Sequence, residues 1–566
     1  MRTTFPLLAL ALGCAGPGRF EPADLIVHHA KVITVDAAFS IAEAVAVKDG
    51  RVVAVGSDEE IFRHAGPATR VIDAEGHPLL PGLFDSHVHL LGASTSEMPE
   101  PLPKVASLEE AFAFIRGKAA STPDGGWIVL RYAFPTRLKE ARFPTRAELD
   151  AAAPRHPVLY HAGPAGMTNS KGLEVSGITK DTPHPPNGQI VKDPKTGEPT
   201  GMLRNAYGAL KGVPAAVAVK DVDVQRDAIR KLLALYNTMG ITSVADRNAP
   251  RETLDHLRAL SAGNQLTCRV NVALAFDPKG SREDVGKKFD ALPGPTGAGD
   301  DWVRVGPIKL FLDGGMLNGS AYMREPWPAG PTYQVVEHDY KGLLFIDPAQ
   351  LRVVLEEGAK RGWQMTAHTA GEGAMDVLLD AYEAVGGIRG KRWCITHANF
   401  PSRRNLERCR ALGVTADVQP AWLFKDGATL LKELGSERMK WFQPYKSWLQ
   451  YTTIGGGSDH MIRLDDLDST NPWNPWLGMW ATIARKTERG PVLNPEEKLT
   501  REEAIRLYTI NNAYLHHEEA LKGSLEIGKL ADFILVDRDP LTCPLDALPD
   551  TRVLGTFVGG REVYAR

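Results

Sequence analysis

The chain has 566 residues, of which 43% are hydrophobic and 24% are charged, and its formal net charge is -3. This length is too great for one ordinary hydrophobic core, although an α/β barrel with an insertion and a side domain would accommodate it. The composition argues against global disorder, and the nearly neutral net charge does not suggest a nucleic-acid partner, which would normally need a basic face.

The first residues have the features of an export signal. Arg2 supplies a positive charge, an apolar run follows at residues 5–12, and small residues precede Cys14. The run is too short to span a bilayer and suits the hydrophobic part of a signal peptide. The segment resembles a bacterial lipobox, in which Ala11 is a weaker match than leucine. Residues 1–23 therefore predict the leader and tether of an exported lipoprotein, attached to a membrane only through a lipid on Cys14 and facing the periplasm or the outside. An ordinary signal peptide or a disordered leader is the alternative.

Both ends of the remaining chain contain β-type runs. Residues 24–80 and 516–566 are rich in valine, isoleucine and leucine, and Asp49-Gly50 and Gly559-Gly560 each separate two such runs. Both dipeptides are hairpin signals. We expect the two ends to pack together as one small β-sandwich.

The middle of the chain, residues 81–515, alternates strand-like and helix-like stretches, which predicts a parallel sheet and a (β/α)₈ TIM barrel. The eight barrel strands are expected to end near His89, Asp246, Leu274, Asp313, His368, His397, Gln419 and Asp459. Residues 95–235, between the first and second strands, are too many for a plain connection. They predict an inserted subdomain over the barrel mouth.

The strongest local motif is His87-Val88-His89 at the end of the first barrel strand. Positions i and i+2 of a strand face the same way, so the two imidazoles point into one space, as two ligands of one metal must. Lys309 lies inside an apolar strand, where a charged amine is disfavoured and a neutral amine could react with CO2 to give a carbamate. A snorkelling lysine, or a salt bridge to Asp313 on the same strand face, is the alternative.

Three later strands also end in side chains that bind metals. Residues 363–368 and 393–397 each end in a histidine, His368 and His397, and residues 452–459 end in Asp459. Each of these alone is more often structural, but the C-terminal strand ends of a barrel carry its active site. Nitrogen and oxygen ligands of this kind suit two divalent ions.

This order of side chains, HxH, Lys, His, His and Asp on strands one, four, five, six and eight, resembles the binuclear amidohydrolase superfamily. Within it, the chain is most similar to the amidohydrolase-3 group of YtcJ-like enzymes. Further matching segments are residues 143–150, 240–246, 508–511 and 523–532. The similarity covers nearly all of the chain after the leader.

The resemblance implies a metal-dependent hydrolase that cleaves a non-peptide carbon–nitrogen bond of a small-molecule amide or cyclic amide. By residue, it implies that His87 and His89 bind the deeper metal, that Lys309 bridges both metals as a carbamate, that His368 and His397 bind the second metal, and that Asp459 is both ligand and proton shuttle. Zinc is the expected metal, with manganese or iron as alternatives. The lysine bridge varies across the superfamily, so Asp313 or another carboxylate could replace it.

Four further side chains are candidates for contact with substrate. They are Asp246, Asp313, Trp422 and His460, all at or near strand ends. For each of them, a packing or hydrogen-bonding role at the barrel rim is the alternative.

The chain departs from the YtcJ-like pattern at pocket positions. The fifth-strand histidine is followed by Thr369-Ala370-Gly371-Glu372, where the group usually has Ala-Ile-Gly-Asp. Glu372 could mimic the proton donor of a single-metal deaminase, and ester or lactone hydrolysis is a nearer alternative. A non-catalytic ligand-binding lipoprotein is the remote one. The oligomeric state stays open, with a homodimer among the alternatives.

Overall fold

The structure is a computed structural model that describes residues 21–566. Cys14 and most of the expected leader lie outside the described residues. At the centre of the fold is an eight-stranded parallel sheet in the order β20-β19-β18-β17-β16-β15-β14-β8. Its two edge strands meet, because Val88 and His460 form a parallel bridge and the Asp459 N–H donates to the His87 carbonyl over 2.7 Å. The sheet therefore closes into the barrel that the sequence predicts.

The barrel strands match the eight predicted strand ends closely. They are almost wholly buried, as expected for parallel strands with both faces covered. Their bounds are β8 (Leu83–Val88), β14 (Ile241–Ala249), β15 (Arg269–Ala275), β16 (Val303–Phe311), β17 (Met365–Thr369), β18 (Cys394–His397), β19 (Thr415–Val418) and β20 (Ile454–Gly456).

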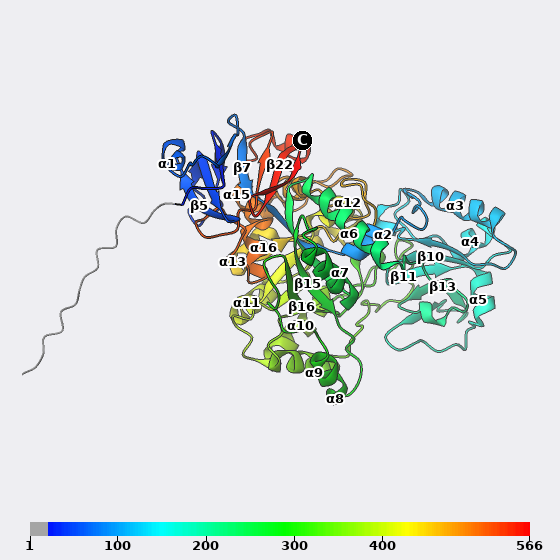
Figure 1. Cartoon of the computed structure of the whole chain (residues 1–566). Helices are drawn as coiled ribbons and strands as arrows, with labels where there is room; N and C mark the ends of the chain where they lie inside the picture. Colours follow the sequence, from blue (N-terminus) through cyan, green and yellow to red (C-terminus); the bar gives the residue numbers. More distant parts are fainter. Residues whose placement is uncertain (1–20) are drawn as a thin grey trace, which may run out of the picture.

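Helices surround this barrel (Figure 1). They are α2 (Leu90–Thr95), α6 (Val222–Asn237), α7 (Arg251–Ala262), α8 (Arg282–Asp290), α9 (Pro348–Lys360), α10 (Glu372–Val385), α11 (Arg403–Leu412), α12 (Pro420–Met439), α13 (Tyr445–Tyr451), α14 (Pro475–Ala484), α15 (Arg501–Leu507) and α16 (Ile510–Leu515), with the short helices η3 (Met316–Asn318) and η4 (Pro495–Glu497). The start of α9 shows why such segments are helical, since the Asp347 side chain caps the N–H groups of Ala349 and Gln350 and Pro348 occupies the first turn. Within residues 21–566, no helix has both the length and the hydrophobicity that crossing a bilayer requires.

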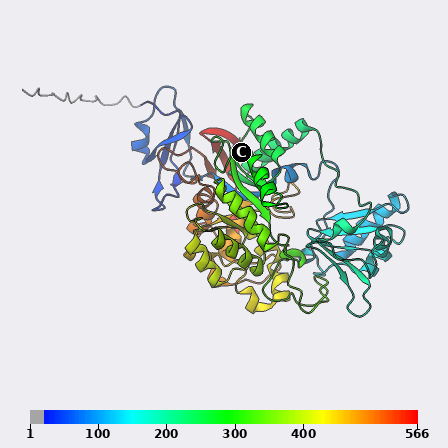
Figure 2. The same cartoon turned by 90° about the horizontal axis from the view of Figure 1, so that it is seen from below.

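A separate five-stranded sheet lies between the first two barrel strands in the sequence. It runs in the order β12-β13-β11-β10-β9 and falls inside the range 95–235, where the sequence predicts an insertion. This inserted subdomain projects from one side of the barrel in both views (Figures 1 and 2). Its elements are α3 (Leu108–Ser121), β9 (Ile128–Arg131), η1 (Pro135–Arg137), α4 (Arg146–Ala152), β10 (Val158–Ala162), β11 (Ala165–Thr168), α5 (Ser170–Ser176), β12 (Gln189–Lys192), β13 (Pro199–Arg204) and η2 (Tyr207–Ala209).

The two ends of the described chain form a pair of sheets with a shared apolar core, which contains Val27, Val47, Leu79, Phe533 and Phe557. One sheet, β5-β4-β1-β6, uses N-terminal strands alone, whereas the other, β23-β22-β21-β7-β2-β3, mixes both ends. The N-terminal elements are β1 (Leu25–His28), β2 (Lys31–Ile33), β3 (Ile41–Ala42), β4 (Ala44–Lys48), β5 (Arg51–Gly56), α1 (Asp58–Phe62), β6 (Arg70–Asp73) and β7 (Pro78–Pro81). The C-terminal elements are β21 (Phe533–Val536), η5 (Leu545–Asp550), β22 (Val553–Val558) and β23 (Arg561–Ala565).

Candidate metal centre

The six side chains that the sequence predicts as metal ligands line one cavity of about 170 Å³ at the barrel mouth. The barrel brings them together because the C-terminal ends of its parallel strands meet at one face. They come from β8, the residue after β8, β16, β17, β18 and the segment after β20, and are His87, His89, Lys309, His368, His397 and Asp459.

Three of these side chains already have the spacing of a metal site. The ligand atoms of His87, His89 and Asp459 all lie within 4.8 Å of one another. Asp459 Oδ1 is 3.3 Å from His87 Nε2 and 3.0 Å from His89 Nε2. The other two imidazoles are close, since the ring centroids of His87 and His397 are 5.0 Å apart and those of His368 and His397 are 4.4 Å apart.

Buried hydrogen bonds orient the imidazoles. His87 Nδ1 lies 2.9 Å from Asp417 Oδ2, and His397 Nδ1 lies 2.6 Å from Gln419 Oε1. In each ring the Nε2 atom is thereby left free for a ligand role, as in metal sites whose histidines are held by a carboxylate or amide. Burial lowers the pKa of both histidines well below the usual range, so they are neutral, which is the form that binds metals.

Asp417, which the sequence did not single out, supports the candidate ligand His87. Besides His87, its carboxylate accepts hydrogen bonds from Ser86 Oγ over 2.7 Å and from Gln419 Nε2 over 2.9 Å. A carboxylate inside the buried strand β19 was the available signal, because such a group is rarely buried without partners.

Asp459 is held in an unusual backbone conformation. Its φ of 57° and the φ of 80° at His397 lie in the left-handed region, which costs about 1–3 kcal/mol for such residues and is concentrated at functional sites. Asn471 Nδ2 donates to the Asp459 carbonyl over 2.7 Å and to its carboxylate over 3.2 Å. Asn471 in turn accepts from Arg137, which the inserted subdomain contributes and which is paired with Asp426 of α12. The inserted subdomain thus helps to fix the Asp459 carboxylate.

Lys309 is the unpaired polar group of the cavity. Its Nζ atom is buried and has no hydrogen-bond partner within residues 21–566, and burial lowers the pKa of the amine to about 7. The salt bridge to Asp313 that the sequence left open is not formed, because that carboxylate accepts the N–H groups of Tyr322, Ala370 and Gly371 instead. An orphaned, partly neutral lysine beside four histidines and an aspartate fits a carbamate that binds metal.

Of the four candidate substrate residues, Trp422 lines the cavity and stacks on His397 with ring centroids 4.6 Å apart. The cavity wall formed by the described residues does not include the other three. Asp246 accepts the N–H of Leu90 over 3.1 Å, and His460 Nδ1 lies 2.7 Å from the Tyr236 hydroxyl, so both hold the barrel rim. Asp313 has the backbone-binding role described above.

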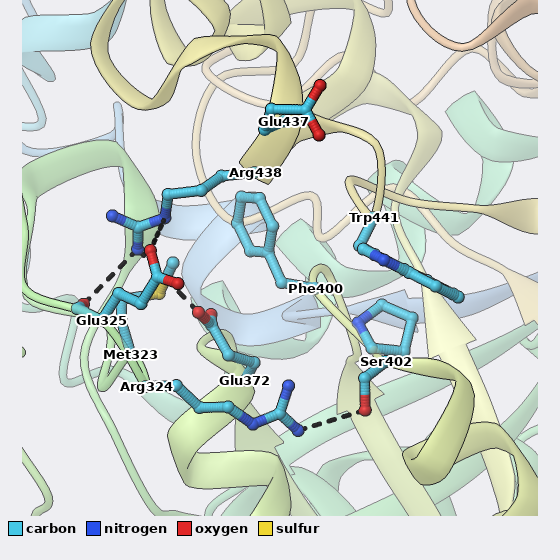
Figure 3. A pocket seen from close by; sticks show the side chains of 10 residues that line it. Met323, Arg324, Glu325, Glu372, Phe400, Ser402, Glu437, Arg438 and Trp441 are labelled. Carbon is cyan, nitrogen blue, oxygen red and sulfur yellow. Dashed lines mark hydrogen bonds and ion pairs between the residues drawn. The ribbon is translucent and has the colours of Figure 1, made fainter.

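Glu372, the candidate proton donor of the alternative deaminase reaction, lies outside the metal cavity. It lines a different pocket together with Arg324 and Arg438 (Figure 3). Its Oε1 atom is 3.9 Å from Arg438 Nη2. A proton donor for chemistry in the metal cavity would have to line that cavity, and Glu372 does not.

Comparison with known proteins identifies the family of the chain. The sequence model of the amidohydrolase family matches residues 70–564. N-substituted formamide deformylase of Arthrobacter pascens is 30% identical over 558 residues, which cover 96% of this chain and 98% of that protein. Putative amidohydrolase YtcJ of Bacillus subtilis is 27% identical over 538 residues, 93% of this chain and 96% of that one. The structure of an uncharacterized metal-dependent hydrolase from Pyrococcus horikoshii OT3 superposes with a TM-score of 0.65 at 23% identity, over 92% of this chain and 99% of that chain, and shows the same fold.

Proposed function

Because the chain belongs to the amidohydrolase family and is a metal-dependent hydrolase, we propose that it cleaves a non-peptide carbon–nitrogen bond of amide or cyclic-amide type. The observation that carries this proposal is the meeting of four histidines, a lysine and an aspartate in one cavity at the strand ends. A relative named for action on N-substituted formamides supports the choice of an amide bond.

The donor set suits two divalent ions, zinc first, with manganese or iron as alternatives. His87 and His89 would hold one ion, His368 and His397 the other, and Asp459 would contact the first. Lys309, once it has reacted with CO2 and lost a proton, would offer two carbamate oxygens as a bridge. Ions in such a site supply an activated water at neutral pH and polarise a substrate carbonyl.

We assign the proton transfers to the Asp459 carboxylate. It would take a proton from the attacking water and return it to the departing nitrogen, which leaves poorly as an anion. In the metal-free site, burial raises the pKa of Asp459. Asn471, through its two hydrogen bonds to Asp459, keeps the carboxylate turned toward the cavity.

Two other reactions remain as alternatives within this proposal. A single-metal deaminase is disfavoured because Glu372 lies outside the cavity. Ester or lactone hydrolysis would use the same site but depends less on a proton donor, because an alkoxide leaves more easily than an amine anion. The experiment below uses this difference to separate it from amide hydrolysis.

The test is Asp459→Asn, assayed on an amide and on an activated ester. Five other ligands remain, so most of the metal should be retained, whereas loss of general acid–base catalysis should lower turnover on the order of 10²–10⁴-fold. The loss should be larger for the amide, whose nitrogen needs a proton. Equal losses on both substrates would mean that Asp459 acts only as a ligand, and unchanged activity in the folded variant would refute the assignment.

A further inference from the structure

Apart from the six residues of the metal centre, the walls of the cavity are mainly apolar. They are formed by Tyr132, Phe134, Phe311, Leu317, Trp422 and Met461, with small contributions from glycine and proline residues. We call this space the apolar chamber. The whole cavity, which includes the space beside the six predicted ligands, has a volume of about 170 Å³, close to that of an engineered apolar cavity of about 150 Å³ that binds benzene. The space left beside the metal positions is smaller still. The space therefore suits a compact apolar group beside the reacting bond.

The amide and indole side chains of the wall already have protein partners. Asn318 donates to the Ala162 carbonyl over 2.7 Å and accepts from Ser320 Oγ over 2.5 Å. Asn471 binds Asp459 and Arg137, and the Trp422 indole N–H points to Asn471 over 3.3 Å. None of these groups is free to pair with a charge on a substrate.

Apart from the ions of the proposed metal centre and their ligands, the chamber also lacks a counter-charge. Among residues 21–566, the cavity wall contains no arginine and no lysine other than Lys309, and its one carboxylate is Asp459. Arg137 comes near, with its guanidinium over the Phe134 ring at 5.4 Å, but it is paired with Asp426 and does not line the cavity. Placing a charged group in a wall without partners is costly, because the group loses its water and gains nothing in return.

Two aromatic rings show where the apolar group would lie. Phe311 stacks on His368 with centroids 5.0 Å apart, and Trp422 stacks on His397 at 4.6 Å. Both rings therefore flank the histidines of the second metal position. Beyond Phe311 and Lys309 lies a wider crevice of about 550 Å³ that contains Asp277 and Lys279, so a long substrate could place a polar end there. A compact substituent would stay within the apolar chamber.

From these observations we infer that the substrate is an uncharged amide whose group beside the scissile bond is compact and apolar. The type of bond, an amide, rests on the proposed function. The preference for an uncharged, compact and apolar group rests only on the walls of the chamber. It separates this chain from hydrolases of N-acyl amino acids, whose substrates carry a carboxylate close to the reacting bond.

The test compares three methanesulfonamides, which resemble the amide but are not hydrolysed by such a site. Their N-substituents have the same shape and differ in charge: isopentyl is neutral, 2-carboxyethyl is anionic and 2-(dimethylammonio)ethyl is cationic. Dissociation constants are measured by calorimetry on the metal-loaded, full-length protein. We expect the isopentyl compound to bind at least tenfold more tightly than either charged compound. Equal or tighter binding of a charged compound, or no binding of the isopentyl compound, would overturn the inference.

Met461 provides a matched pair of variants, because its side chain lines the chamber and is only partly buried. Met461→Lys supplies the missing counter-charge, and Met461→Gln supplies a polar group of similar length without charge. Met461→Lys should improve binding of the carboxylate at least tenfold relative to Met461→Gln, and an equal effect of both variants would contradict the electrostatic argument.

Turnover is measured separately with N-isopentylformamide. If this amide is not hydrolysed although the isopentyl sulfonamide binds with the expected preference, the proposed amide hydrolysis is wrong and the inference about the chamber stands. If the amide is hydrolysed while the charged compounds bind as tightly as the isopentyl compound, the inference about the chamber is wrong and the proposed amide hydrolysis stands.

Discussion

Gly457 is the residue at which the barrel closes against a metal ligand, and adding one methyl group there should damage the site. A Cβ atom at Gly457 would lie 2.7 Å from the His87 backbone nitrogen, 2.8 Å from His87 Cβ and 2.8 Å from Ser86 Oγ. Ordinary contacts begin near 3.4 Å, so in Gly457→Ala the two strands must separate by several tenths of an ångström.

These neighbours cannot yield easily, because buried hydrogen bonds hold them. The His87 N–H donates to Asp85 Oδ1 over 2.9 Å, and Ser86 Oγ donates to Asp417 over 2.7 Å. Overpacking of this kind typically costs about 1–3 kcal/mol of folding free energy. A shift approaching 1 Å at the ligands would lower turnover by about 10²-fold. We therefore expect a folded variant with lower metal content and a loss of turnover larger than its loss of stability would explain.

The assay combines metal content by mass spectrometry, turnover and thermal unfolding. The control is Gly117→Ala on the exposed surface of α3, where an added Cβ meets nothing within 4 Å and alanine is the better helix former. That variant should keep metal and turnover at wild-type values. Full metal content and wild-type turnover in Gly457→Ala would refute the reasoning.

Three further changes have definite expected results. Lys309→Ala should lower the metal content from the proposed two ions per chain, with partial rescue by small carboxylic acids, because it removes the expected bridge; unchanged metal content measured by mass spectrometry would count against the carbamate. Asn471→Leu should keep the metal but lower kcat by about 10-fold or more, since a hydrogen bond to a charged group contributes about 1.5–3 kcal/mol; steady-state kinetics showing only a higher KM would place Asn471 in substrate binding instead. Cys14→Ala should abolish membrane attachment in fractionated cells, and equal solubility of both forms in the cytoplasm would exclude a lipoprotein signal.

The family and the barrel strands could be predicted from the sequence, and both predictions are confirmed. Short runs that end in a candidate metal ligand, such as Cys394–His397, place the end of a barrel strand. The Asp49-Gly50 hairpin was also accessible, because only a few residue types tolerate the two positive φ angles, 49° and 74°, that its turn requires.

The sequence did not predict which side chains at the barrel rim point into the cavity and which bind neighbouring loops. Asp313 and Asp246 follow the same pattern as Asp459, yet their carboxylates accept backbone N–H groups of neighbouring loops. The roles of Asn471 and Arg137 were hidden for another reason, since their contact joins residues 334 positions apart. Such contacts depend on how the inserted subdomain docks, and local sequence patterns carry no information about that.

The way in which the barrel closes sets the order in which the protein can be completed during synthesis. Strand β8, which carries His87, emerges early, but the Asp85 carboxylate beside it is bound by the Ser458 N–H from 373 positions later. Strand β7, immediately before β8, pairs with β21 near the C-terminus. Contacts this distant in sequence form slowly, because their loop-closure entropy must be offset before they contribute. A growing chain that has not yet reached β20 would therefore leave the edge beside His87 open, and the metal centre could be completed only after residues 454–459 have emerged.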